Sequence, residues 1–156
     1  MNLIVVADTG AVISLVLSGT FRICQKHFRI ISGEKVAEEL KEISLEDDEL
    51  GKAAKEALNE IEIVSTGKKF DIGEDEALEL SEKMGADILI SDDIKFVKKH
   101  RNNEKISFSV VLLGILMERK IISKNDFLKA INAIFGKRKW EENLIYLVAK
   151  NMLEDK

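Results

Sequence analysis

The segment from Gly73 to Asp93, GEDEALELSEKMGADILISDD, restricts the fold more than any other part of the sequence. Ala77, Leu80 and Met84 recur at the spacing of one helical face, and Gly85 follows as a glycine does just past a helix end. The apolar run ILI then indicates a parallel strand that is covered on both faces. The segment therefore predicts a helix, a tight turn and a buried strand that ends at a pair of aspartates.

Short apolar runs and helical segments alternate along the rest of the chain. The predicted strands are 3–7, 29–31, 61–64, 88–90 and 106–109. The predicted helices are 11–17, 20–27, 34–43, 44–59, 73–84, 94–99, 110–117, 123–135 and 141–153, with a basic break at 136–140. We place the inward side of the helix 123–135 at Phe127, Leu128, Ile131 and Ile134. Alternating strands and helices favour a parallel sheet with helices on both faces, and 156 residues favour one domain.

Composition excludes several classes of protein. Hydrophobic residues make up 46% of the chain, enough for a core, and the net charge of −4 argues against a surface that is basic throughout. The single cysteine, Cys24, cannot form an intramolecular disulfide, and its apolar neighbours indicate a buried thiol. The opening residues do not resemble a signal peptide, and no apolar run approaches the ~18 residues of a membrane span. We therefore expect a cytoplasmic protein with no membrane segment.

Acidic residues follow two of the predicted strands. Asp8 ends the first strand and begins a helix, while Asp92 and Asp93 end the strand 88–90. The carboxyl ends of parallel strands share one edge, where ligands bind in open α/β sheets. Glu39 and Glu74 border the inward faces of helices that can overhang this edge. Each acid alone is also explained as a helix cap, a salt-bridge partner or a solvated side chain, but their convergence at one edge favours a site.

The residue types at this edge indicate its chemistry. Clustered carboxylates suit Mg²⁺ or Mn²⁺, and no histidine or cysteine cluster suggests zinc. Such sites activate water and stabilise the leaving oxygen of a phosphodiester. The sequence contains neither a glycine-rich P-loop nor a serine nucleophile elbow. Two basic segments, KKHR at 98–101 and GKRKW at 136–140, are either contacts for a nucleic-acid backbone or solvated surface.

Four segments together resemble the PIN domain, a family of metal-dependent ribonucleases. They are VVADTGAVISL with Asp8, VAEEL with Glu39, GEDEALELSEKMGAD with Glu74, and ILISDDIKF with Asp92 and Asp93. The segments around Glu74 and Asp93 are closest to a subgroup of prokaryotic PIN proteins, and the general resemblance is to VapC-like toxin ribonucleases. It runs from residue 3 to about residue 136. We expect one PIN-like domain over 1–156, with residues 137–156 as a C-terminal helix outside the resemblance.

The resemblance implies a three-layer α/β/α sandwich with a central parallel sheet. It also implies that Asp8, Glu39, Glu74 and Asp93 form the catalytic set and hold one or two Mg²⁺ or Mn²⁺ ions. The third acid is a glutamate where toxins usually have an aspartate.

Several neighbouring residues remain alternatives or supporting candidates. Asp92 is an alternative metal ligand to Asp93, and Glu76 is a second candidate beside Glu74. Thr9 and Ser91 match the hydroxyl residues that support the acids in the family.

The function implied is cleavage of phosphodiester bonds in single-stranded RNA. Lys98, Lys99 and Arg101 are the candidate phosphate contacts. Family analogy adds a homodimer and, for a toxin, an antitoxin protein that blocks the acidic cleft. The main alternative is a catalytically weak or inactive PIN-like module that acts by binding RNA or protein. A receiver-like or phosphatase-like protein with Asp8 as phospho-acceptor is disfavoured, because the strand 106–109 does not end in a lysine.

Overall fold

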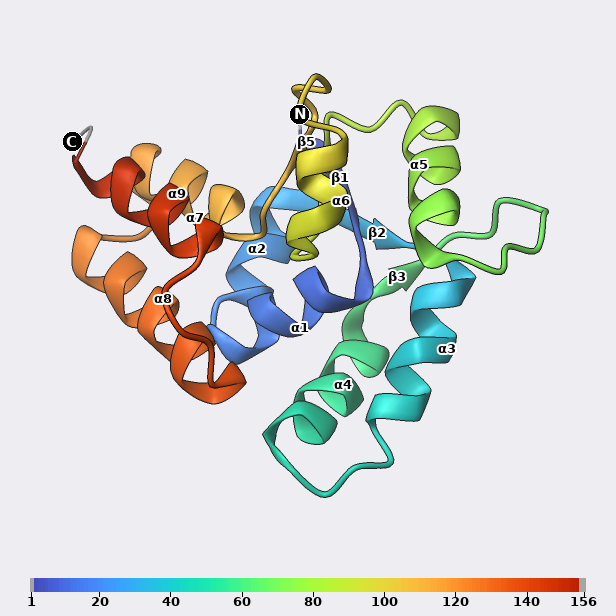
Figure 1. Ribbon diagram of the computed structural model, residues 1–156, viewed down its shortest axis with the longest axis horizontal. Coiled ribbons are helices and arrows are strands. Elements are labelled where there is room, and N and C mark those ends of the chain that lie inside the picture. Colours follow the sequence, from blue (N-terminus) through green and yellow to red (C-terminus); the bar gives the residue numbers. More distant parts are fainter. Residues whose placement is uncertain (1, 155–156) are drawn as a thin grey trace.

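The computed structural model describes residues 2–154, in which a parallel sheet lies between two layers of helices (Figure 1). The strands are β1 (Leu3–Ala7), β2 (Phe28–Ser32), β3 (Glu62–Ile63), β4 (Ile88–Ile90) and β5 (Ile106–Ser107). The helices are α1 (Thr9–Leu17), α2 (Phe21–His27), α3 (Glu34–Ile43), α4 (Glu49–Glu60), α5 (Gly73–Lys83), α6 (Ile94–Lys99), α7 (Val110–Glu118), α8 (Lys124–Arg138) and α9 (Leu144–Glu154). The predicted three-layer α/β/α architecture is confirmed.

The strand order is β3-β2-β1-β4-β5, with every pair parallel. β1 is central, and the chain builds outward from it first through β2 and β3, then through β4 and β5. The order therefore reverses between β1 and β4, and this switch point opens a crevice at the carboxyl ends of the strands. Ala7 pairs with Ile90 in this register, so the residues that follow, Asp8 and Ser91, emerge side by side.

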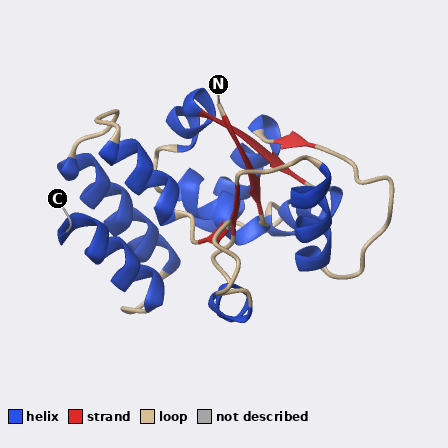
Figure 2. Ribbon diagram, turned by 90° about the horizontal axis from the view of Figure 1, so that it is seen from above, coloured by secondary structure: helices blue, strands red, loops and turns tan. Residues whose placement is uncertain are grey.

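Alternate residues of each strand face the two helical layers, because successive side chains point to opposite sides of a sheet. Val5 and Ala7 belong to the large core formed with α1, α4 and α7–α9. Val6 belongs to a smaller core that includes Leu80 of α5 and Phe96 of α6. Figure 2 shows these helices on both sides of the strands. Burial on both faces explains why the strands are almost continuously apolar.

Local signals set several helix ends where the sequence predicts them. Asp8 caps α1 and Asp93 caps α6, each accepting a hydrogen bond from a backbone amide of the first turn. Ser123 and Asp126 form a capping box at the start of α8. Gly85, which follows the C-cap Met84 of α5, has φ +60°, a conformation that favours glycine.

The structure corrects the prediction for α8. The helix does not break at Gly136 but continues to Arg138, and Lys139 ends it in the left-handed conformation. A glycine inside a helix costs only about 1 kcal/mol relative to alanine, and tertiary contacts of Arg138 hold the last turn. Leu128 is 43% exposed instead of inward-facing, because Ala130 takes the buried position beside Phe127.

Smaller differences occur at other boundaries. α4 begins at Glu49, later than expected, because Asp48 caps it. β5 ends at Ser107, and α9 begins only at Leu144. Cys24 is buried and free, as expected. Among residues 2–154, no helix has the length and apolarity needed to cross a membrane.

Candidate active site

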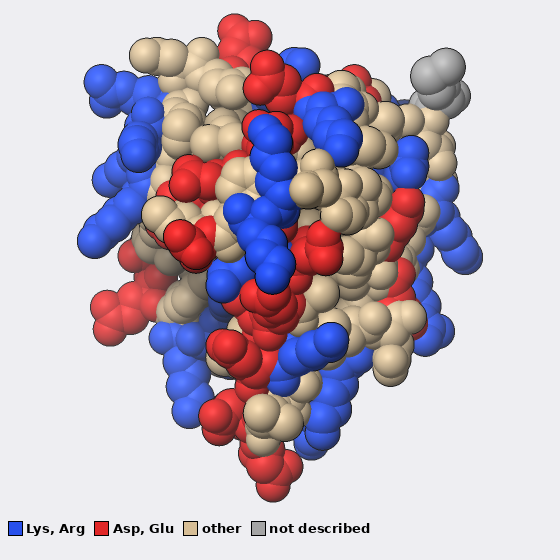
Figure 3. Space-filling view, turned by 90° about the vertical axis from the view of Figure 1, so that its right-hand side faces the viewer, with Lys and Arg blue, Asp and Glu red and all other residues tan. Residues whose placement is uncertain are grey.

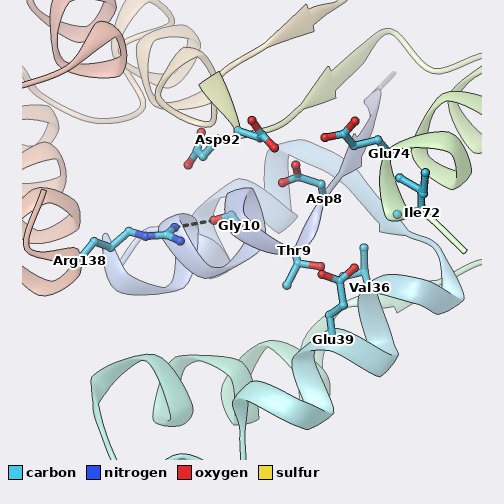
Figure 4. Close-up of a pocket in the computed structure, with 11 residues that line it drawn as sticks. Asp8, Thr9, Gly10, Val36, Glu39, Ile72, Glu74, Asp92 and Arg138 are labelled. Carbon is cyan, nitrogen blue, oxygen red and sulfur yellow. Dashed lines mark hydrogen bonds between the residues drawn. The ribbon is translucent and has the colours of Figure 1, made fainter. Parts of the chain in front are cut away.

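A cleft of about 480 Å³ opens at the carboxyl edge of the sheet, over the switch point between β1 and β4 (Figure 4). It is lined by Asp8, Thr9, Gly10, Val36, Glu39, Ile72, Gly73, Glu74, Asp92, Asp93 and Arg138. The lining thus includes each of the five acids that the sequence proposes as metal ligands. They come from segments up to 85 positions apart (8 to 93), which β1, α3, α5 and β4 bring together.

Asp8 lies at the centre of this cleft, at the junction of β1 and α1. Its Oδ1 accepts a hydrogen bond from the Ala11 amide at 2.9 Å, and its Oδ2 accepts one from the Ser91 hydroxyl. Burial raises the pKa of Asp8 to about 7, and repulsion from Asp92 and Asp93 adds to the rise, while the two hydrogen bonds oppose it. Asp8 is therefore partly protonated at neutral pH in the absence of a bound cation.

The two adjacent aspartates after β4 have different surroundings. Asp92 accepts hydrogen bonds from the amide and the hydroxyl of Ser109, at 2.9 and 2.6 Å, which ties it to the start of α7. Asp93 is exposed, caps α6 through the Phe96 amide at 3.2 Å and lies against Glu74. Asp92 thus has its oxygens occupied by protein donors, whereas Asp93 is the more available ligand.

Glu74 and Glu39 reach the cleft from two helices, and each has a raised pKa. Burial is the main cause of the rise for Glu74, followed by repulsion from Asp93. Burial also raises the pKa of Glu39, while Lys35 and a hydrogen bond with Thr9 oppose the rise. Gly73 leaves room for Glu39, since a Cβ at that position would lie 3.0 Å from Glu39 Oε1.

Glu76 is not part of the cleft lining. Its side chain is buried between α5 and α3, and its Oε1 accepts a hydrogen bond from the Lys35 amide at 2.9 Å. The carboxylate thereby caps the first turn of α3, which has no capping side chain at its own N-cap, Gly33. Glu76 therefore ties α5 to the start of α3, the helix that carries Glu39.

The predicted hydroxyl residues lie in the site, and the predicted basic residues lie outside its lining. Thr9 lines the cleft, and Ser91 donates to Asp8 while it accepts from the Asp93 amide at 3.1 Å. The basic set Lys98, Lys99 and Arg101 is exposed at the end of α6. Of these three, Lys99 lies near enough to Glu74 to lower its pKa.

Arg138 lines the cleft and is absent from the site that the sequence predicts. Its Nη1 donates to the Gly10 carbonyl at 2.8 Å and to the Ser14 hydroxyl at 2.7 Å. The sequence marks Arg138 only as a member of the basic segment GKRKW. Arg138 is 128 positions from Gly10, so no local pattern connects the two residues. Only the packing of α8 against α1 reveals that the side chain enters the site.

The donors in the cleft suit Mg²⁺ or Mn²⁺, because every candidate ligand is a carboxylate oxygen. The pKa of Asp8 is raised, and Glu74 lies against Asp93. Neighbouring carboxylates repel one another in this way unless a cation neutralises their charge. Among the residues that the structure describes, no three acidic side chains are disposed to ligate one ion as they stand. Mg²⁺ keeps several waters and commonly takes only one or two protein carboxylates, so the residues fit such an ion.

Comparison with known proteins identifies a family over nearly the whole chain. A family model described as a PIN domain matches residues 4–152. The match continues beyond residue 136, where the resemblance read from the sequence stops, and covers most of α9. No curated protein matches the sequence.

Proposed function

The chain belongs to the PIN domain family, a nuclease fold, and from this premise we propose that it is a metal-dependent endoribonuclease that cleaves single-stranded RNA. The observation that supports the proposal is that Asp8, Glu39, Glu74 and Asp93 line one cleft at the switch point of the sheet. No serine nucleophile elbow or P-loop offers a competing chemistry.

In this proposal the four acids hold one or two Mg²⁺ or Mn²⁺ ions. When bound, a divalent cation supplies positive charge that polarises a phosphodiester and makes water more acidic. Asp93 is the ligand after β4, and Asp92 fixes the start of α7 through Ser109. Ser91 orients the carboxylate of Asp8, and Thr9 orients that of Glu39. Asp8, Glu39 and Asp93 thus each have a hydrogen-bond partner that limits rotation of the carboxylate, which favours a preorganised cleft.

The proton on Asp8 links metal binding to pH. A carboxyl group with a pKa of about 7 is partly protonated at neutral pH, and it must lose that proton to bind a cation. The proposal therefore requires Mn²⁺ affinity to rise with pH through this region and then level off.

The test is cleavage of a mixed-sequence single-stranded RNA in Mn²⁺ and in EDTA. The proteins compared are the wild type, Asp8→Asn and the control Asp47→Asn, which removes an exposed charge in the loop before α4. We expect cleavage by the wild type and the control in Mn²⁺ only, and at least a 100-fold loss in Asp8→Asn, consistent with the several kcal/mol that metal catalysis supplies.

Other outcomes separate the alternatives. Equal cleavage by the wild type and Asp8→Asn would point to a contaminating nuclease and leave the proposal without support. Absence of cleavage by the wild type, with Mn²⁺ binding still measurable by calorimetry, would favour the PIN-like module that binds RNA or protein without cutting it.

The toxin role, the antitoxin partner and the homodimer are proposals that rest on family resemblance. An antitoxin that covers the cleft should prevent both RNA cleavage and Mn²⁺ binding. Sedimentation analysis of the isolated protein tests the homodimer directly, and a single species at the monomer mass would contradict it.

A further inference from the structure

Arg138 brings a cation into a cleft that is otherwise acidic. The lining contains five carboxylates and, within the described residues, no other lysine or arginine. Burial lowers the pKa of Arg138, whereas Asp92 and Asp8 raise it. A guanidinium remains protonated in proteins, so this side chain supplies a permanent positive charge beside the acids.

The protein fixes this guanidinium from two sides. Nη1 is bound to Gly10 and Ser14 of α1, as Figure 4 shows for Gly10. The Trp140 ring lies under the guanidinium, with its centroid 4.5 Å from the Arg138 Cζ atom. Phe135 in turn contacts the Trp140 ring edge-on, with 5.3 Å between centroids. The side chain is therefore held in place before any ligand arrives.

The remaining donors of Arg138 border the cleft beside Gly10. An alanine Cβ at position 10 would lie 3.8 Å from Arg138 Nη2, 3.9 Å from Asp8 Oδ1 and 4.0 Å from Asp92 Cβ. These are ordinary contact distances, so Gly10 leaves room for about a methyl group between the guanidinium and the acids. Within residues 2–154, neither Nη2 nor Nε of Arg138 donates a hydrogen bond. Every buried side-chain nitrogen among these residues does have a hydrogen-bond partner. These donors are therefore accessible from solvent.

An anion that enters the cleft is the ligand that these donors suit. A guanidinium offers paired donors that match the oxygens of a phosphate. Gly10 also belongs to the first turn of α1, where the helix dipole favours negative charge. The face that carries α5 and the loop before it has acidic and basic side chains interspersed and no extended basic patch (Figure 3). Within the described residues, Arg138 is the one cation of the cleft lining.

We propose that Arg138 binds a backbone phosphate of the RNA substrate and places it against the acidic cluster. The inference rests on the proposed function and adds to it the residue that holds the substrate. It also gives the C-terminal part of the chain a role in the site, because Arg138 is in the last turn of α8 and Trp140 follows that helix.

The experiment measures binding of a fluorescein-labelled single-stranded RNA by anisotropy over a range of salt concentrations. Ca²⁺ replaces Mn²⁺, and the RNA is recovered and checked to be intact. The variants are Arg138→Gln, Arg138→Lys and the control Lys137→Gln, which removes a charge from the preceding, exposed residue of α8. Thermal unfolding of each variant shows whether it is folded.

We expect Arg138→Gln to bind RNA about tenfold more weakly. The slope of log affinity against log salt should decrease by about 0.7, the value for one phosphate contact on a single strand. Arg138→Lys keeps the charge but loses the paired donors, so its affinity should fall while its salt slope stays that of the wild type. Lys137→Gln should change affinity less than twofold.

Three results would overturn the inference, and together they separate it from the proposed function. If the wild type cleaves RNA but Arg138→Gln and Lys137→Gln bind equally well, with equal salt slopes, Arg138 serves only to fasten α8 to α1. If the wild type neither binds nor cleaves RNA, both proposals fail. If Arg138→Gln does not fold, Arg138→Lys decides, and unchanged RNA affinity in that variant contradicts the paired contact.

Discussion

Asp8 illustrates at the scale of one residue how a site can oppose the stability of the fold. Its carboxyl group is half-buried beside Asp92 and Asp93, and these surroundings raise its pKa from 3.8 to about 7. Burial and like charges both disfavour the ionised form. The same side chain caps α1 through the Ala11 amide, so it cannot be removed without loss to the helix.

This raised pKa predicts how stability depends on pH without metal. The native state holds the Asp8 proton more tightly than the unfolded state, so its contribution is fully present below pH 4 and is lost as pH rises through about 7. The loss is at most about 4 kcal/mol. The raised pKa values of Glu39, Glu74 and Asp92 act with the same sign. Thermal unfolding in EDTA should therefore give a lower Tm at pH 8 than at pH 5.5.

Variants and added metal make this test specific. Asp8→Asn should flatten the pH dependence and raise the Tm at pH 8, whereas the exposed change Asp47→Asn should leave the dependence as it is. Mn²⁺ should restore the Tm at pH 8 by neutralising the acids. A wild-type Tm in EDTA that rises from pH 5.5 to 8 would contradict the assignment.

At the scale of elements, the contact between α3 and α5 depends on one buried carboxylate. Glu76 of α5 binds the Lys35 amide of α3, and it fills the space beside Gly33. A Cβ at Gly33 would lie 2.0 Å from Glu76 Oε1, although Gly33 itself has an unstrained φ of −87°. The glycine is thus required by the neighbouring side chain and not by the backbone.

A double-mutant cycle tests this relation. Glu76→Ala leaves the Lys35 amide without its partner and should lower the free energy of unfolding by about 1–3 kcal/mol. Gly33→Ala should cost about 1–3 kcal/mol by overpacking, and nearly nothing when Glu76 is already alanine. Urea unfolding of the two single variants and the double variant gives the coupling energy.

Glu79→Ala is the matched control on the same helix. Its side chain is 38% exposed and pairs with Lys68 at the surface, so we expect a change below about 1 kcal/mol. Additive effects of Gly33→Ala and Glu76→Ala would show that the two residues do not share this space.

At the scale of the whole molecule, α9 belongs to the same packed unit as the sheet. It contacts α7 and α8, and Ile145 and Ala149 are part of the large core. Figure 1 shows α7, α8 and α9 together on one side of the molecule. α7 and α9 approach closely at Gly114, where a Cβ would lie 2.2 Å from Met152 Sδ.

Two substitutions on α9 test whether this docking stabilises the domain. Ile145 is 1% exposed and Leu147 is 53% exposed. Ile145→Ala should therefore cost about 2–5 kcal/mol, whereas Leu147→Ala should change stability by less than about 0.5 kcal/mol. Both are measured by urea unfolding, and equally small effects would mean that α9 contributes no stability to the core.

Much of the fold follows from short-range patterns in the sequence. The apolar run from Leu3 to Ala7 is typical of a strand covered on both faces, and the capping residues Asp8 and Ser123 place two helix starts. Strand ends and helical faces also indicate which acids can meet at one sheet edge, and the family resemblance, not the spacing, favours Asp93 over Asp92. The helix break predicted at Gly136 is wrong, because the tertiary contacts of Arg138 outweigh the lower helix propensity of glycine.

The sequence alone determined the strands, the helices and which acids are able to meet at one sheet edge, because these depend on periodicity over a few residues. Only the tertiary structure decided which side chains share the cleft and which are used elsewhere. It placed Arg138 in the cleft, Glu76 against α3 and Asp92 against Ser109. These contacts join residues between 17 and 128 positions apart, so no local pattern records them. Packing of whole elements fixes such distances, and with them the electrostatics of the site.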